Sequence, residues 1–93
     1  MKLEGEIWDG RLIAAGRARC GLSSRDLARE AGVSSRTVVR IEGDTEVHVS
    51  PRQRHGCVSA ETWAKIVGVL NTHGVELIGA SNGAGPGVRW RRS

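Results

Sequence analysis

The sequence contains no phenylalanine or tyrosine and only two cysteines and two prolines. Its three tryptophans, Trp8, Trp63 and Trp90, are the only large aromatic anchors in 93 residues. The core therefore has to be built from aliphatic side chains around them, and we expect these tryptophans to be mostly buried or at an interface. Two cysteines, Cys20 and Cys57, are too few for a disulfide framework.

Long apolar runs are also missing. No segment approaches the roughly 20 apolar residues that cross a bilayer, and the chain lacks the apolar region of a signal peptide. The 39% of hydrophobic residues suffice for one small core but not for two. We therefore expect a single domain over 1–93, located in a reducing cytoplasm and without membrane contact.

Residues that support catalysis or metal binding are sparse. No Ser/His/Asp set, carboxylate pair or phosphate-binding glycine loop stands out, so we expect no enzyme activity. His48, His55 and Cys57 lie close in sequence, and Cys20 would complete four metal ligands. Their spacing matches no zinc pattern, and we expect neither a metal nor another cofactor. Cys20 is more simply interpreted as a small buried hydrophobic residue.

Positive charge is what the sequence does have. Lysine and arginine total 14 against 10 acidic residues, giving a formal net charge of +4. The arginines gather over 25–40 and again over 89–92. A basic surface of this kind attracts polyanions, including nucleic acids.

The stretch from Gly21 to Gly43 contains two short amphipathic segments joined by a tight turn. Ser23 and Ser34 precede the two segments, where a hydroxyl caps a helix N-terminus. Gly32 suits a turn position with positive φ. The apolar positions that fall on the inner faces or close the turn are Leu27, Ala28, Ala31, Val33, Val38 and Ile41. This pattern predicts two helices packed at a steep angle.

The same stretch resembles the helix-turn-helix of the Cro/repressor-type family, also called the XRE family. The resemblance is carried by Leu22-Ser23, Leu27-Ala28, Ala31-Gly32-Val33-Ser34, Val38 and Ile41-Glu42-Gly43. The chain departs from the family at Ser24, where Gln is usual. The resemblance implies a mainly α fold, a Cro/repressor-like helix-turn-helix bundle with the motif at 22–43. It also implies an ion pair between Arg17 and Glu42 that ties the first helix to the third.

Before the motif, Asp9 is the expected N-cap of a helix over Gly10–Cys20. Two glycines weaken this helix by roughly 1 kcal/mol each relative to alanine, so packing has to stabilise it. The segment 1–9 either packs Trp8 against the core or simply leads into the helix.

After the motif an inserted loop occupies 44–58. Alternation over 46–50 predicts a strand and Pro51–Gly56 a turn, so we expect a hairpin that returns at Val58. The tip of this hairpin carries the basic residues Arg52, Arg54 and His55. These side chains either reach a phosphate or the minor groove of DNA, or belong to a solvated loop.

A helix over 59–73 follows, capped by Ser59 and ended by Gly74. Its core stripe is Trp63, Ile66, Val67 and Leu70. Strands over 75–78 and 87–91, joined by a glycine-rich connector, form a small C-terminal β-ribbon over 75–91. This tail also resembles a C-terminal extension of some small bacterial regulators of the family. A two-stranded ribbon is marginal alone, so we expect it either to pair across a two-fold axis, which we prefer, or to pack on the helices.

In the family, the second motif helix enters the major groove of double-stranded DNA. With Val38 and Ile41 facing inward, Arg36 is placed to bind guanine and Val39 to contact a thymine methyl group. Ser24, Arg25 and Thr37 are expected at phosphates, whereas Ser35 and Arg40 suit either a base or a phosphate. The complete predicted set of DNA-binding residues is Ser24, Arg25, Ser35, Arg36, Thr37, Val39, Arg40, Arg52 and Arg54. A solvated basic face is the alternative.

The resemblance thus implies a sequence-specific DNA-binding transcriptional regulator, a repressor that binds a partly palindromic operator as a homodimer. The alternative is an antitoxin-type DNA-binding protein in which residues 75–91 bind a partner protein instead of a second copy.

Overall fold

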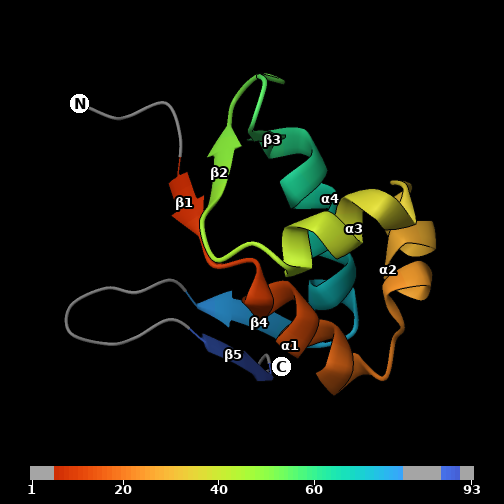
Figure 1. Cartoon of the computed structure of the whole chain (residues 1–93). Helices are drawn as coiled ribbons and strands as arrows, with labels where there is room; N and C mark the ends of the chain where they lie inside the picture. The colour runs from red at the N-terminus through yellow and green to blue at the C-terminus, as the bar shows by residue number, and fades with distance from the viewer. Residues whose placement is uncertain (1–5, 79–86, 91–93) are drawn as a thin grey trace.

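The fold is mainly α, with four helices and five short strands in the described part of the chain (Figure 1). The computed structural model describes residues 6–78 and 87–90. In chain order the elements are β1 (Glu6–Trp8), α1 (Arg11–Cys20), α2 (Ser24–Ala31), α3 (Ser35–Glu42), β2 (Val47–Ser50), β3 (Val58–Ser59), α4 (Ala60–Thr72), β4 (Val75–Ile78) and β5 (Gly87–Trp90). None of these helices is long and apolar enough to cross a membrane.

Serine caps define where three of the helices begin. The Ser23 hydroxyl accepts a hydrogen bond from the Asp26 N–H at 3.0 Å, and the Asp26 carboxylate accepts one from the Ser23 N–H at 3.1 Å. Ser34 and Ser59 cap α3 and α4 through the N–H groups three residues further on. Gly32 ends α2 with φ of 74°. The predicted caps and turn of this helix pair are confirmed.

The expected N-cap of α1 is wrong by one residue. Gly10 is the N-cap, and the Asp9 carboxylate instead accepts the N–H of Arg11 at 3.0 Å. The reason is a close backbone approach: the Gly10 N–H donates to the Asp44 carbonyl at 2.8 Å, and a Cβ on Gly10 would lie 1.8 Å from the Ile41 carbonyl oxygen. This glycine is required where α1 begins against the end of α3.

One aliphatic core joins all the helices. Its fully buried side chains are Ile13, Leu27, Val38, Ile41, Val47, Ile66, Leu70 and Val75. Trp63 is 7% exposed and Trp8 is half-buried beside it, with ring centroids 5.6 Å apart. The packing of Trp8 on the core is therefore confirmed, as is the burial of Trp63. The side chain of Trp90 lies outside the described residues.

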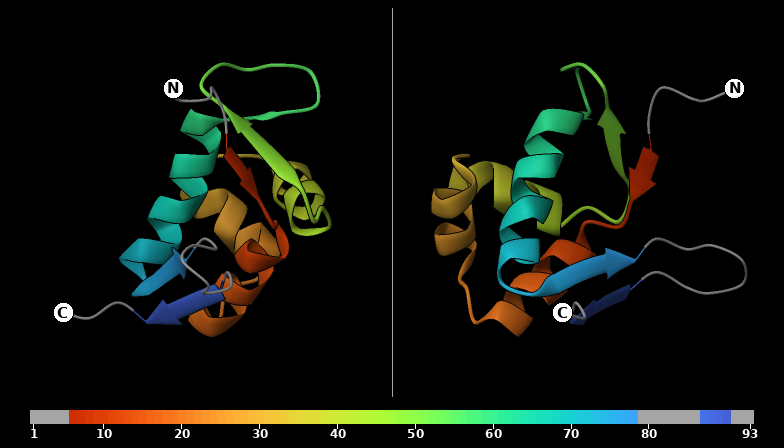
Figure 2. Two further views of the ribbon diagram at one scale, coloured as in Figure 1. Left: turned by 90° about the vertical axis from the view of Figure 1, so that its left-hand side faces the viewer. Right: turned by 180° about the vertical axis from the view of Figure 1, so that it is seen from behind.

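The hairpin expected over 46–58 is wrong. β2 pairs antiparallel with β1 from the N-terminal segment, and β3 lies on the other side of β2 and pairs with it in parallel, Val49 opposite Val58. A parallel partner needs a connection that brings the chain back to the starting end of the strand. The chain achieves this with the wide loop 51–57, which arches over the end of the sheet (Figure 2), and β3 then runs directly into α4.

The predicted C-terminal strands are present as β4 and β5. They pair antiparallel, with Val75 opposite Trp90, and form a sheet separate from β1–β2–β3. Val75 is buried, and Leu77 and Val88 pack against the core. The ribbon thus packs on the helices, at the end of the molecule away from the loop 51–57 (Figures 1 and 2). The connector 79–86, the tail 91–93 and the arm 1–5 lie outside the described residues.

Candidate nucleic-acid interface

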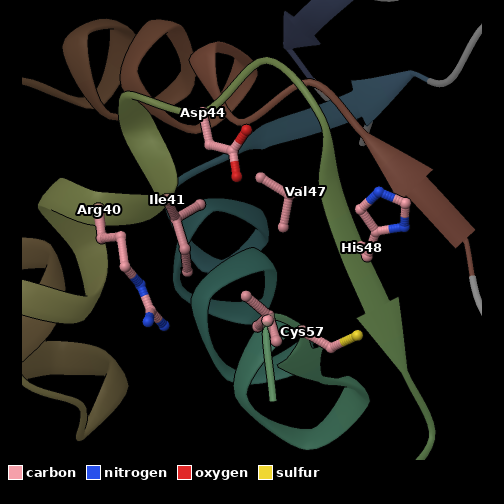
Figure 3. A pocket seen from close by; sticks show the side chains of 8 residues that line it. Arg40, Ile41, Asp44, Val47, His48 and Cys57 are labelled. Carbon is pink, nitrogen blue, oxygen red and sulfur yellow. The ribbon is translucent and has the colours of Figure 1, made fainter. Parts of the chain in front are cut away.

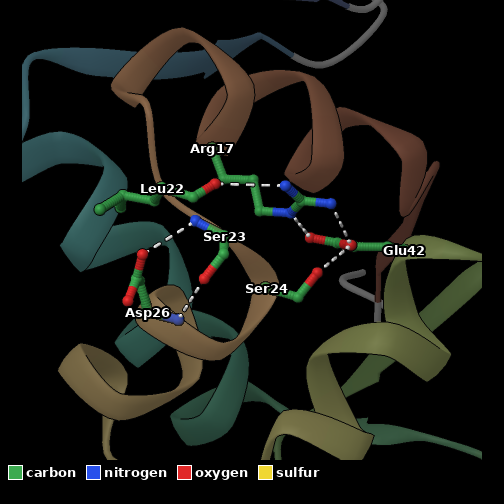
Figure 4. Close-up of polar contacts among 6 residues, drawn as sticks. All are labelled: Arg17, Leu22, Ser23, Ser24, Asp26 and Glu42. Carbon is green, nitrogen blue, oxygen red and sulfur yellow. Dashed lines mark hydrogen bonds and ion pairs between the residues drawn. The ribbon is translucent and has the colours of Figure 1, made fainter.

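A partly buried ion pair holds α3 in place relative to α1 and α2 (Figure 4). Arg17 Nε donates to Glu42 Oε2 at 2.6 Å and Arg17 Nη2 donates to Glu42 Oε1 at 3.1 Å. Nη1 of the same arginine reaches the Leu22 carbonyl at 3.2 Å, and the Ser24 hydroxyl donates to Glu42 at 3.1 Å. The Arg17–Glu42 pair implied by the family resemblance is confirmed. Bidentate geometry of this kind fixes orientation as well as distance.

The outer face of α3 carries a row of exposed side chains. Val38 and Ile41 are buried as expected, which turns a row of side chains outward: Ser35, Arg36, Val39 and Arg40 are exposed. Val39 is 58% exposed, and with Ile7 it is one of two large hydrophobic side chains that are exposed among the described residues. Thr37 is half-buried and its hydroxyl lies 2.9 Å from that of Ser34. A polar helix face with one apolar residue is thereby presented to solvent.

The described arginines divide by their electrostatic partners. Away from α3, Arg11 pairs with Asp9 at 2.6 Å and Arg29 pairs with Asp26 at 3.0 Å. By contrast, the side chains of five exposed arginines make no hydrogen bond or ion pair with any described residue: Arg25, Arg36, Arg40, Arg52 and Arg54. These five are the arginines predicted from the sequence to bind DNA. We call them the unpaired arginines.

The loop 51–57 lies beside α3. Thr37 and Arg40 of α3 line one cavity, of about 260 Å³, together with Gln53 and Cys57 of the loop. Within the loop, the Cys57 N–H donates to the Arg54 carbonyl at 3.0 Å. The loop therefore brings Gln53 and Cys57 beside α3, and its exposed arginines, Arg52 and Arg54, flank Gln53 in the sequence, although the strands that carry the loop are parallel and not a hairpin. Gln53 was not indicated by the sequence, because its proximity to α3 depends on this return path.

Negative charge sits at the two ends of the helix pair. The backbone N–H of Ser23, the Ser23 hydroxyl and Arg29 lower the pKa of Asp26, which keeps this carboxylate ionised at the N-terminus of α2. Asp44 and Glu46 are exposed just after α3. The surface is thus basic along α3 and the loop, and acidic beyond the end of α3.

The cysteines and histidines do not gather into a metal site. Within residues 6–78 and 87–90, no group of three or more His, Cys, Asp or Glu side chains is placed to hold a metal ion. Cys20 is half-buried; burial, and to a lesser extent the charge of Glu30, raise the pKa of its thiol.

No protein-family model matches this chain, and no curated protein matches it. The interpretation of the surface therefore depends on its own residues and geometry.

Proposed function

We propose that this protein is a sequence-specific, double-stranded DNA-binding transcriptional regulator of the Cro/repressor helix-turn-helix type. The observation that carries the proposal is the division among the described arginines: Arg11, Arg17 and Arg29 are paired with carboxylates, whereas the unpaired arginines lie along α2, α3 and the adjoining loop. An unpaired guanidinium can bind DNA without first breaking an ion pair within the protein. Its fork of N–H donors matches phosphate and the guanine edge.

In this proposal α3 enters the major groove. Arg36, in the first turn of α3, donates to guanine O6 and N7, which discriminates against other bases by about 1–3 kcal/mol. Val39, one turn further along, contacts a thymine methyl group, which accounts for an apolar side chain that is 58% exposed. Ser35, at the start of the same helix, donates to a base edge or a phosphate.

The remaining contacts are to the DNA backbone. Arg25, Arg40, Arg52 and Arg54 bind phosphates, with Arg52 and Arg54 reaching the strand that borders the groove occupied by α3. Thr37 shares this role through its hydroxyl. The Ser24 hydroxyl is engaged by Glu42, and so the phosphate at this position is bound by the free N–H groups of the first turn of α2.

The protein acts as a homodimer on a partly palindromic operator and represses by occluding polymerase. Two copies would each insert α3, which explains how a small interface with few base contacts reaches sequence selectivity. The ribbon β4–β5 lies at the opposite end of the molecule from the loop 51–57, so it is available for the two-fold contact without covering α3. Sedimentation of the free protein tests this part: a monomer at micromolar concentration would instead favour a partner protein on the ribbon.

The experiment starts from a random duplex library, since the operator is unknown. Selected and scrambled duplexes are compared by fluorescence anisotropy over a salt series, with wild type, Arg36→Lys, Arg36→Ala and Arg52→Ala. Lys65→Ala is the charge-matched control, because Lys65 is exposed on α4, which lies on the opposite side of the molecule from α3 in the left view of Figure 2.

Arg36→Lys keeps the charge but loses the bidentate fork, so we expect a roughly tenfold or greater loss of selectivity with an unchanged salt slope. Arg52→Ala should weaken both duplexes equally and lower the salt slope by about one. Lys65→Ala should change neither. A selection that enriches no sequence, or equal losses in Arg52→Ala and Lys65→Ala, would overturn the proposal.

A further inference from the structure

A second cavity, of about 240 Å³, lies between the C-terminal half of α3 and strand β2 (Figure 3). Its floor is apolar and consists of Ile41, Val47 and Val58, each less than 10% exposed. Its rim is polar: Arg40, Asp44, His48 and Cys57 surround the opening. A cavity with an apolar floor and a few polar groups at its rim has the composition of a small-ligand site.

Arg40 and Asp44 put opposite charges on the rim without pairing to each other. They are four residues apart, yet no ion pair or hydrogen bond joins them. One Asp44 oxygen accepts the Glu46 N–H at 3.0 Å, which fixes the carboxylate and leaves its other oxygen available. Figure 3 shows both side chains bordering the central opening, with Cys57 at its lower end.

We propose that this cavity binds a free α-amino acid with an aliphatic side chain. The carboxylate of the ligand would bind the Arg40 guanidinium, its ammonium group would bind Asp44, and its side chain would cover the apolar floor. A purely anionic ligand would face the Asp44 carboxylate and a purely cationic one would face Arg40, so the pair selects a zwitterion. The volume is that of about eight water molecules, which suits a ligand of roughly eight to ten non-hydrogen atoms, such as valine, leucine, isoleucine or methionine.

The affinity should be modest, with a dissociation constant of about 1 mM, because both charged groups are exposed and water screens them. Binding by itself does not depend on the proposed function. Its regulatory consequence does: Arg40 is also a proposed phosphate contact, and one guanidinium does not serve a ligand carboxylate and a phosphate at the same time. The amino acid would therefore weaken DNA binding, and DNA would weaken amino-acid binding by the same factor.

The test is a titration of the ¹⁵N-labelled full chain, followed by backbone amide shifts, with L-valine, L-leucine, L-isoleucine and L-methionine up to about 10 mM. Two analogues of leucine serve as ligand controls: 4-methylpentanoate lacks the ammonium group and 3-methylbutylamine lacks the carboxylate. We expect saturable shifts confined to the residues around the cavity with at least one of the four amino acids. Neither analogue should saturate in the same range.

Variants separate the site from general charge effects. Asp44→Asn keeps the acceptor for the Glu46 N–H, and Arg40→Gln keeps a polar side chain; each should weaken the binding amino acid about tenfold or more. The controls are Glu46→Gln and Lys65→Gln, which remove the same charges from exposed positions that do not line the cavity, and which should leave affinity unchanged.

Several results would overturn the proposal: no saturable shift with any of the four amino acids, equal binding of leucine and its analogues, or undiminished binding by Asp44→Asn. Because the titration contains no DNA, a failure of DNA binding with intact amino-acid binding would reject only the proposed function. The reverse outcome would reject only the ligand site.

Discussion

Replacing Glu42 by glutamine should destabilise the domain more than any other single loss of charge described above. Its carboxylate accepts two hydrogen bonds from Arg17 and one from Ser24, and the Glu42 side chain is 9% exposed. Breaking a fully buried pair costs about 3–5 kcal/mol. The Arg17 side chain is 25% exposed and glutamine keeps one acceptor oxygen, so we expect a smaller loss, of about 2–3 kcal/mol.

Such a loss lowers the melting temperature of a domain of this size by roughly 8–24 °C. The free energy of unfolding and the melting temperature should be measured by urea and thermal unfolding followed by circular dichroism. Glu46→Gln is the matched control, because the exposed Glu46 carboxylate has no described partner and its replacement should cost less than about 0.5 kcal/mol. Combining Glu42→Gln with Arg17→Met removes both charges and should recover part of the loss. A loss below about 1 kcal/mol, or a double variant whose loss is the sum of the two single losses, would refute the assignment of this pair as a structural clamp.

Three further predictions concern positions outside the clamp. Gly10→Ala should destabilise the domain by more than about 3 kcal/mol because its Cβ would overlap the backbone of α3, whereas Gly68→Ala, which has open space inside α4, should stabilise it by up to about 1 kcal/mol; equal effects in urea unfolding would contradict this. Hydrogen bonds from Ser23 and Arg29 lower the pKa of Asp26 below its ordinary value of 3.8, so the stability that this carboxylate contributes is present above pH 3.8 and is lost as the pH falls through the folded-state pKa. Asp26→Asn should therefore lower the melting temperature at pH 7, and its difference from wild type should shrink in acid. A difference at pH 2 as large as that at pH 7 would contradict this prediction. Cys20 should react with a disulfide reagent at pH 8 more slowly than Cys57, because its raised pKa lowers the fraction of thiolate. The reaction of the wild type should therefore have a fast and a slow phase, and the slow phase should vanish in Cys20→Ser. A slow phase that remains in Cys20→Ser would belong to Cys57 and would contradict this prediction.

The local features of the helix pair were predictable because their signals are short-range. Ser23, Ser34 and Gly32 each act on groups within a few residues, so capping and turn chemistry define α2 and α3 without reference to the rest of the chain. The Arg17–Glu42 pair spans 25 residues and was reached only through the family resemblance. Spacing alone does not bring those two side chains together.

The pairing of the strands in the sheet β1–β2–β3 could not be predicted from the sequence, and the reason is physical. The antiparallel partner of β2 is β1, a three-residue strand about 40 residues earlier in the chain, and nothing in its short sequence specifies pairing at that distance. A strand followed by a turn favours a hairpin locally, and the direction of β3 is instead set by its continuation into α4. The rim of the second cavity was missed for the same reason, because Asp44, His48 and Cys57 meet Arg40 only once β2 and the loop have been placed.

The pairing of β1 with β2 also sets an order of events during synthesis. β1 leaves the ribosome first but has no partner until residues 47–50 follow, by which time α1, α2 and α3 have all been made. Bringing β1 and β2 together closes a segment of about 40 residues, which is unfavourable until the helices within it have packed. These helices should therefore pack first, and the pairing of β1 with β2 should follow. Until β1 docks, β2 lacks its antiparallel partner, and the loop 51–57 that follows β2 carries two of the unpaired arginines. A variant that slows the docking of β1 would yield a protein with a native α2–α3 pair and a mispositioned loop.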